Sequence, residues 1–95
     1  MAVRDKFKNV RRLEHLVRGF SNHRRIEMLE LLNREPELSI AEVCGRLKIN
    51  FKTASEHVRR LALAGFVMKR NEGLYVRLAL TPRGFHILKF LRTLE

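Results

Sequence analysis

The chain contains few of the residues that build covalent or metal-based sites. Its 95 residues include one cysteine, no tryptophan and two prolines. A single cysteine excludes an intrachain disulfide, which fits a reducing cytoplasm. The sequence has no glycine-rich phosphate loop, no metal-ligand cluster and no carboxylate pair converging on a pocket. We therefore expect a protein that is not an enzyme, with no catalytic, cofactor or metal site.

Long apolar runs are also absent. None approaches the roughly 20 residues needed to cross a bilayer, and the first residues lack the unbroken apolar stretch of a signal peptide. Hydrophobic residues make up 45% of the chain and charged residues 32%, which is typical of a globular protein. We expect one compact domain over residues 1–95, a cytoplasmic location and no membrane partner.

Acidic residues are few outside the middle of the chain. The net charge is +10, and residues 21–50 carry five basic and five acidic side chains. Residues 51–80 carry six basic side chains against two acidic ones. A concentrated positive charge is typical of a protein that binds a polyanion, and nucleic acid is the leading candidate. The alternatives are a charge that serves solubility and attraction to an anionic membrane surface.

Helical periodicity organises the first half of the chain. Apolar residues at helical spacing predict a first helix from about Val3 to Phe20, with an apolar arc wider than one core contact requires. Ser21 and Asn22 offer capping side chains. A second helix is predicted from His23 to Asn33, and the residue before Pro36 disfavours its continuation.

Two further helices follow at close spacing. Ser39 and Glu42 form a capping-box pattern that opens a short helix. Asn50 is placed to cap the next helix, residues 51–64, and Gly65 supplies the left-handed residue that commonly follows a helix. Two short helices joined by a tight turn have the helix-turn-helix layout.

The remaining sequence predicts a hairpin and a last helix. Residues 66–68 and 74–78 are apolar and β-prone, and the turn is expected at residues 71–73. Thr81 and Pro82 then open a helix that reaches about residue 94. The expected fold is mainly α with a small β-hairpin, a winged helix-turn-helix in the order α-α-α-α-β-β-α.

The helix at residues 51–64 has two chemically distinct sides. At 100° per residue, Ala54, Val58 and Leu61 share the side expected to face the core. The first turns of a helix in the major groove approach base edges, whereas later turns lie near phosphates. The helix is expected to contact bases through Lys52, Thr53, Ser55 and Glu56 and phosphates through Arg59 and Arg60. The hairpin is expected to contact the DNA backbone or the minor groove through Lys69, Arg70 and Arg77, unless these are ordinary solvated charges.

Two side chains of this helix have alternative roles. Glu56 either accepts a hydrogen bond from cytosine N4 or pairs with Arg60 one turn later. Phe51 either contacts a thymine methyl group or acts as a hydrophobic staple of the turn, and we favour the staple.

The sequence resembles the ArsR-type (arsenic repressor-like) winged-helix regulators over roughly residues 13–80. The similarity lies in residues 21–26, in Thr53-Ala54-Ser55-Glu56-His57-Val58-Arg59-Arg60-Leu61, and in Ala64-Gly65-Phe66-Val67. Residues 80–84 are more similar to the junction between wing and helix in MarR-type regulators. The resemblance implies a packing role or a phosphate contact for His57, which joins the predicted DNA-contacting set.

The resemblance also implies a homodimer built from terminal helices, here near residues 3–20 and 82–94. This agrees with their broad apolar surfaces, and the expected interface residues are Phe7, Val10, Val17, Phe85, Leu88 and Leu91. The cysteines of the metal-sensing members are absent, so Cys44 is interpreted as a buried structural thiol. A metal site shared between protomers by His15 and His86 is the less favoured alternative.

The resulting hypothesis is a homodimer that binds double-stranded DNA sequence-specifically and regulates transcription as a repressor. The alternative is a winged-helix interaction or architectural module that binds DNA without sequence preference. Nothing in the sequence identifies a small-molecule effector.

Overall fold

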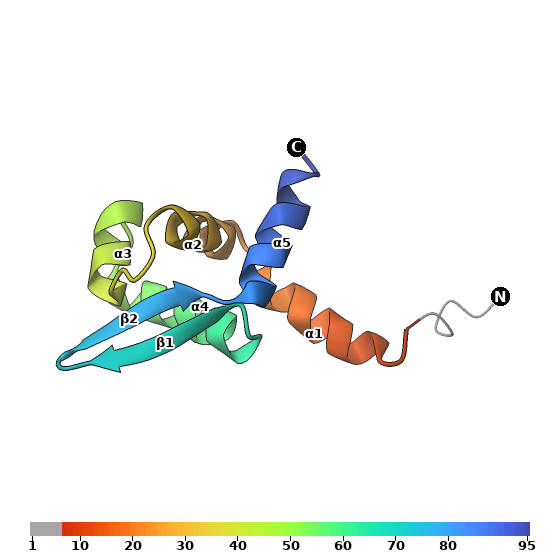
Figure 1. Ribbon diagram of the computed structural model, residues 1–95, viewed down its shortest axis with the longest axis horizontal. Helices are drawn as coiled ribbons and strands as arrows, with labels where there is room; N and C mark the ends of the chain where they lie inside the picture. Colours follow the sequence, from red (N-terminus) through yellow and green to blue (C-terminus); the bar gives the residue numbers. More distant parts are fainter. Residues whose placement is uncertain (1–6) are drawn as a thin grey trace.

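The computed structural model describes residues 7–95. Five helices and a two-stranded antiparallel hairpin follow one another in the predicted order (Figure 1). Their bounds are α1 Val10–Phe20, α2 His23–Arg34, α3 Ile40–Leu47, α4 Phe51–Leu63, β1 Val67–Glu72, β2 Tyr75–Leu80 and α5 Pro82–Arg92. The predicted fold, a winged helix-turn-helix, is therefore confirmed.

Each helix begins directly after a side chain that caps it. The capping oxygens accept backbone N–H groups of the first turn, and they belong to Asn9, Asn22, Ser39, Asn50 and Thr81. The predicted capping box at Ser39 and Glu42 is present in both directions. Because these donors have no partner within a helix, the caps define where each helix starts.

The prediction for the first helix was wrong at its beginning. The helix starts at Val10, because the Asn9 side chain accepts the Arg12 N–H and fixes the start there. Phe7 therefore lies before the helix, and Val3 lies outside the described residues. Apolar residues at helical spacing continue before Asn9, so periodicity alone placed the start of the helix too early.

The hydrophobic core lies between α2, α4, α5 and the hairpin. Leu29 from α2, Leu61 from α4 and Leu78 from β2 have no exposed surface. The buried apolar residues are Phe20, Met28, Leu29, Leu31, Leu32, Leu38, Val43, Ala54, Val58, Leu61, Phe66, Val67, Leu78 and Leu88. This core holds one side of α4 and leaves its other side at the surface.

The hairpin turn differs from the prediction. Asn71 pairs with Val76 and Glu72 with Tyr75, so both belong to the strands. The turn itself consists of Gly73 and Leu74, with φ of +60° at the glycine. A two-residue hairpin turn with positive φ at its first position favours glycine there, so the turn begins at Gly73, the last residue of the predicted turn.

Backbone hydrogen bonds join the hairpin to the segment before α3. Leu78 N–H donates to Leu38 O at 2.9 Å, and Glu37 N–H donates to Leu78 O at 3.1 Å. Ser39 and Arg77 form a further bridge. The helix-turn-helix and the hairpin are therefore tied together beside the core.

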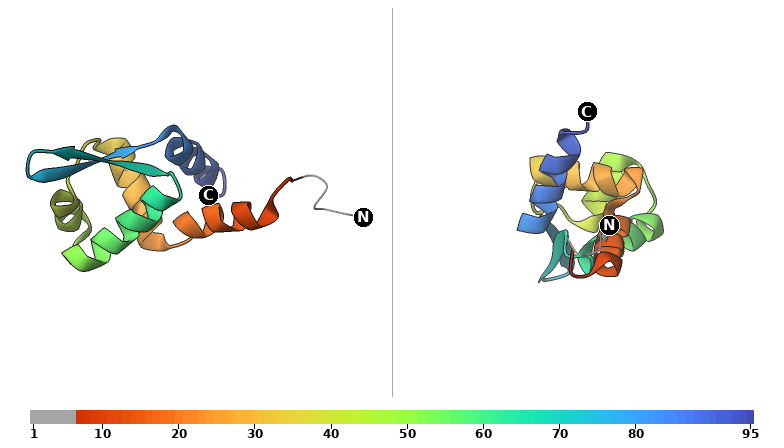
Figure 2. Two further views of the ribbon diagram at one scale, coloured as in Figure 1. Left: turned by 90° about the horizontal axis from the view of Figure 1, so that it is seen from below. Right: turned by 90° about the vertical axis from the view of Figure 1, so that its right-hand side faces the viewer.

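The protein is elongated, with extents of 52 × 28 × 22 Å. The beginning of α4 and the tip of the hairpin lie at the same end, and α1 projects from the opposite end (Figure 2, left). Among the described residues, no helix is both long and apolar enough to span a bilayer.

Candidate nucleic-acid interface

The two sides of α4 are divided as the helical wheel predicted. Ala54, Val58 and Leu61 are buried, whereas Lys52 and Arg59 are exposed on the outer side. The side chain of Asn50 accepts the Thr53 N–H at 2.8 Å and fixes the first turn. Helix α4 thus presents a polar and mostly basic face to solvent.

The first turn of α4 exposes an aromatic ring beside its polar side chains. Lys52 and Thr53 are exposed and Ser55 is half-buried. Phe51 is 58% exposed, whereas Ile49 packs against the core. The staple interpretation of Phe51 was therefore wrong: Ile49 occupies the position before the cap, and the Phe51 ring is left at the surface.

Glu56 is the centre of an ion-pair network on the outer side of α4. Arg59 donates to its two carboxylate oxygens at 3.0 and 2.7 Å, and Arg60 donates to one of them at 3.2 Å. The hydrogen bonds from Arg59, helped by those from Arg60, lower the pKa of Glu56 to about 2. The predicted ion pair between Glu56 and Arg60 is confirmed. Arg59 forms a second ion pair with Glu56, through two hydrogen bonds. The cytosine contact stays a prediction.

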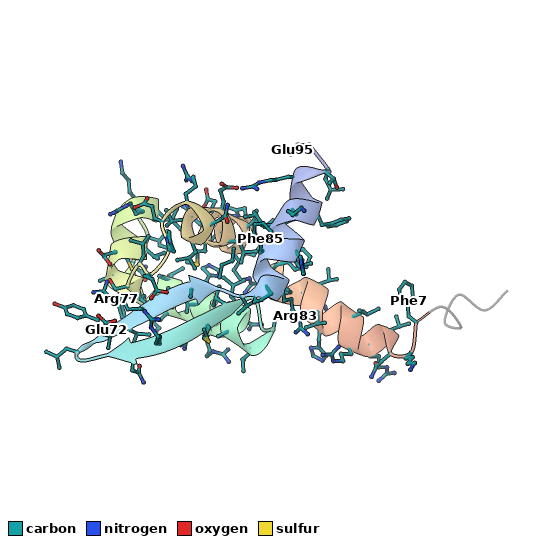
Figure 3. The ribbon with its side chains drawn as sticks, viewed as in Figure 1. Phe7, Glu72, Arg77, Arg83, Phe85 and Glu95 are labelled. Atoms are coloured by element: carbon teal, nitrogen blue, oxygen red, sulfur yellow. The ribbon has the colours of Figure 1, made fainter. Side chains whose placement is uncertain are left out.

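The hairpin arginines turn toward the segment that leads into α3. Arg70 donates to the Glu37 carboxylate. Arg77 is half-buried and donates to Glu37 O at 3.3 Å and to the Glu42 carboxylate at 3.4 Å. Lys69 makes no ion pair within residues 7–95. Glu72 and Arg77 face each other near the hairpin tip (Figure 3).

These hairpin contacts change the interpretation of three predicted site residues. Arg70 and Arg77 are tied to carboxylates in the free protein, whereas Lys69 is available to a ligand. The carboxylates of Glu37 and Glu42 lie 33 and 35 residues away in the sequence, so no local pattern identifies them. The concentration of acidic residues in the middle of the chain was the only sign of these ion pairs. That these carboxylates would neutralise the hairpin arginines was missed.

A cluster formed by Arg25 and His57 was missed by the sequence analysis. His57 on α4 lies beside Arg25 on α2, and the pKa of each is lowered. Burial is the larger cause for both groups, followed by the charge of Arg25 for His57 and that of Arg60 for Arg25. The +10 charge gave no reason to single out Arg25, because the sequence does not show that α2 begins beside α4.

The residues predicted to form a dimer interface separate into two groups. Phe7, Val10, Val17 and Phe85 are exposed, and Leu91 is half-buried. Leu88 is only 3% exposed because it packs into the core of its own protomer, so it does not belong to an interface. Three exposed apolar side chains on or near these helices were missed, namely Leu13, Phe90 and Leu94.

Metal-ligating side chains do not gather in the described part of the chain. No three of its histidine, cysteine, aspartate and glutamate residues are placed to hold an ion. Cys44 is a free thiol, partly buried against the core, which fits the expected structural role. The shared site of His15 and His86 stays a hypothesis, because it requires a second protomer.

The chain matches a known family over half its length. The family is described as winged helix-turn-helix DNA-binding, and the match covers residues 21–68. The chain belongs to this family. The match includes α2, α3, α4 and the start of the hairpin, the elements that carry the polar face described above.

One curated relative of this winged helix-turn-helix chain is an uncharacterised protein of Methanocaldococcus jannaschii. It is 33% identical over 60 residues, which are 63% of this chain and 22% of the relative. The matched region is thus about a fifth of the relative's length.

Solved structures share the architecture over nearly the whole chain. HlyU from Vibrio cholerae is 28% identical, covers 93% of this chain and 96% of its own, and has a TM-score of 0.79. HlyU from Vibrio vulnificus, described as a transcriptional regulator, is also 28% identical, with coverages of 99% and 98% and a TM-score of 0.77.

A third structure shows the same fold at lower identity. It is the homodimeric DNA-binding domain of Mb0332 from Mycobacterium bovis, a possible ArsR-family regulator, which is 19% identical with a TM-score of 0.82. It covers 99% of this chain and 86% of its own. The predicted resemblance to ArsR-type winged-helix regulators is confirmed by these likenesses at the level of the fold.

Proposed function

We propose that the chain is a homodimeric, sequence-specific DNA-binding protein of the cytoplasm that represses transcription. The observation that carries this proposal is the exposed face of α4, which begins with a lysine and short polar side chains and continues into arginines. A helix with this order matches the major groove, where base edges meet its first turns and phosphates its later turns.

The site residues divide by the part of DNA that they contact. Lys52, Thr53 and Ser55 contact base edges, because they lie in the first two turns of α4. Arg59 and Arg60 contact phosphates, once the phosphates replace the Glu56 carboxylate. Lys69 contacts the backbone from the hairpin, and Arg70 and Arg77 contribute only when they leave Glu37 and Glu42.

A dimer is supported by exposed apolar side chains on the two terminal helices. Val10, Val17 and Phe7 are exposed on or beside α1, and Phe85 is exposed on α5. Isolated exposed apolar residues are ordinary, but a group on two terminal helices is typical of a protein interface. The homodimeric state of the Mycobacterium bovis domain adds support. Such a dimer would place two α4 helices on successive half-sites about one helical turn apart.

Repression is the regulatory outcome that we propose. A dimer bound across a promoter excludes other proteins from that DNA without a catalytic site or an activating surface. Two proteins of the same fold, PagR of Bacillus anthracis and BigR of Xylella fastidiosa, are described as transcriptional repressors. They are 18% and 23% identical to this chain, so they support the proposal through the fold.

Selection of binding sites from random DNA tests the proposal directly. The expected result is an enriched palindrome, bound with an affinity that falls steeply with salt because phosphate contacts release counterions. Lys52→Ala should relax the preference at one base of each half-site, whereas Arg59→Ala should weaken all sequences alike. Salt-dependent binding without an enriched motif would favour the architectural alternative, and weak binding independent of salt would reject DNA as the ligand.

A further inference from the structure

Two buried side-chain nitrogens on the α2 side of α4 lack hydrogen-bond partners. They are Nε of Arg25 and Nδ1 of His57, and no other buried side-chain nitrogen or oxygen in residues 7–95 is without a partner. Buried polar atoms are almost always paired, so two such atoms on neighbouring helices require an explanation. An arginine that is partly removed from water without a counter-ion is especially costly.

The surroundings of these atoms are positively charged. Burial, together with the charge of Arg60, lowers the pKa of Arg25. Burial, together with the charges of Arg25, His23 and Arg24, lowers the pKa of His57. Each group is therefore held in a field that disfavours its protonated form. Glu56 opposes this field for both groups.

The nearby carboxylates are already engaged by other arginines. Glu27 pairs with Arg24 at 3.0 Å, and Glu56 pairs with Arg59 and Arg60. Within residues 7–95, Arg25 has no ion pair. The first backbone N–H groups of α2 are satisfied by Asn22, so the site consists of side chains and not of a free helix end. What the cluster lacks is an anion.

The position of the cluster indicates which anion it binds. One flank of α4 faces the hairpin, where Arg59 and Lys69 line a shared groove. On the helical wheel, His57 and Arg60 lie on the opposite flank of α4, and Arg60 lines a separate groove there with residues of α1. A helix in the major groove has a phosphate backbone on each side, so both flanks of a recognition helix require cations.

We propose that Arg25, together with His57 and Arg60, binds a backbone phosphate of DNA on the side of α4 that lies away from the hairpin. This site rests on the proposed function and adds Arg25 of α2, which is outside the helix-turn-helix, to the DNA-contacting residues. The phosphate supplies the anion for Arg25 and favours protonation of His57. It replaces Glu56 as the partner of Arg60.

Arg25→Gln tests the site through the salt dependence of DNA binding. Each phosphate contact contributes a slope of about −0.9 to a plot of log affinity against log salt concentration. Arg25→Gln should therefore reduce the slope by up to about 0.9 for each protomer, since Arg60 still faces the phosphate, and weaken all sequences alike. Arg25→Lys, which keeps the charge, should retain most of the slope. Arg34→Gln is the matched control, because Arg34 carries the same charge at the far end of α2.

A second measurement uses the unaltered protein. Neutral methylphosphonate linkages placed one at a time along a bound duplex should weaken binding at a position on the α2 flank, besides those on the hairpin flank. If only the hairpin-flank positions matter, or if Arg25→Gln changes the slope no more than Arg34→Gln, the site is rejected while DNA binding stands. If the unaltered protein binds DNA without salt dependence, the proposed function itself fails.

Discussion

The helices α1 and α4 cross each other closely but differ in how they expose apolar and basic side chains. At the crossing, a side chain on Gly19 of α1 would meet the Cβ of Ala64 at 2.5 Å. Away from it, α1 exposes a row of apolar side chains, Val10, Leu13 and Val17, beside its charged ones, whereas the outer side of α4 is mainly polar and basic. Both helices are amphipathic, but α4 buries one whole side in the core, whereas α1 buries only the two residues at its end.

The composition of the exposed side also distinguishes them. A charged face is suited to binding a polyanion. Water hydrates the charged side chains of the free protein, and phosphates replace that water on binding. An apolar face matches a protein surface, because its exposure to water is unfavourable. The contrast between the two helices thus separates a DNA-binding end from an association end, and four changes test that separation.

The largest expected effect is on the association end. Val17 is 51% exposed on α1, and Val17→Glu would place a charge from each protomer in an apolar interface. The dimer should dissociate, and DNA affinity should fall by about 10²-fold or more because two linked half-site contacts become independent. Sedimentation equilibrium and gel-shift titration measure the two effects. Val17→Leu should leave both unchanged, and a monomeric unaltered protein would refute the assignment of this surface.

The crossing itself provides the next test. Gly19→Ala should lower the free energy of unfolding by about 1–3 kcal/mol, because the added methyl group overlaps Ala64 in a packed contact. Gly45→Ala is the matched control: Gly45 lies in α3 with no atom within 4 Å of the added carbon. That variant should gain about 0.5–1 kcal/mol from helix propensity. Chemical denaturation measures both, and equal effects of the two variants would refute a close crossing.

A smaller effect is expected at the DNA-binding end. Glu56→Gln removes the carboxylate that holds Arg59 and Arg60, so affinity for unselected DNA should rise several-fold and depend more steeply on salt. Glu14→Gln breaks a comparable pair with Arg18 on α1 and should change neither. At a selected DNA site, Glu56→Gln separates the two roles of Glu56. A loss of affinity there identifies a cytosine contact, and a gain excludes it.

The smallest effect is a pH dependence of folding. The pKa of His57 is lowered in the folded protein by burial and by Arg25, whereas an unfolded histidine titrates near 6.5. Protonation therefore favours the unfolded chain. The His57 contribution to stability is complete above pH 6.5 and decreases as the pH falls toward the lowered pKa. Denaturation of the unaltered protein and of His57→Gln between pH 7.5 and about 5 should differ in slope, and parallel curves would exclude the effect.

The sequence predicted the elements well because their signals are local. Asn22, Ser39, Asn50 and Thr81 cap the helices that were expected after them, and Gly65 has the predicted positive φ of +81°. The errors have local causes too. The cap at Asn9 was not recognised, and the hairpin turn was centred before Gly73 instead of on Gly73 and Leu74.

The site was predicted less completely because its remaining parts depend on tertiary contacts. The pairing of Arg70 with Glu37 and the position of Arg25 beside His57 arise only when α2, α3 and the hairpin come together. The helical wheel found the outer side of α4, but it could not show which charges on that side are already neutralised. Leu88 was misassigned for the same reason, since periodicity does not say which partner covers an apolar residue.

The backbone hydrogen bonds that join Leu78 to Leu38 and to Glu37 fix more than the fold. They hold the hairpin at a fixed distance from the helix-turn-helix. In the proposed complex, DNA with an unsuitable groove width must deform to fit, because the protein does not adjust. The chain would then discriminate between sites by the stiffness and shape of base pairs that it never contacts.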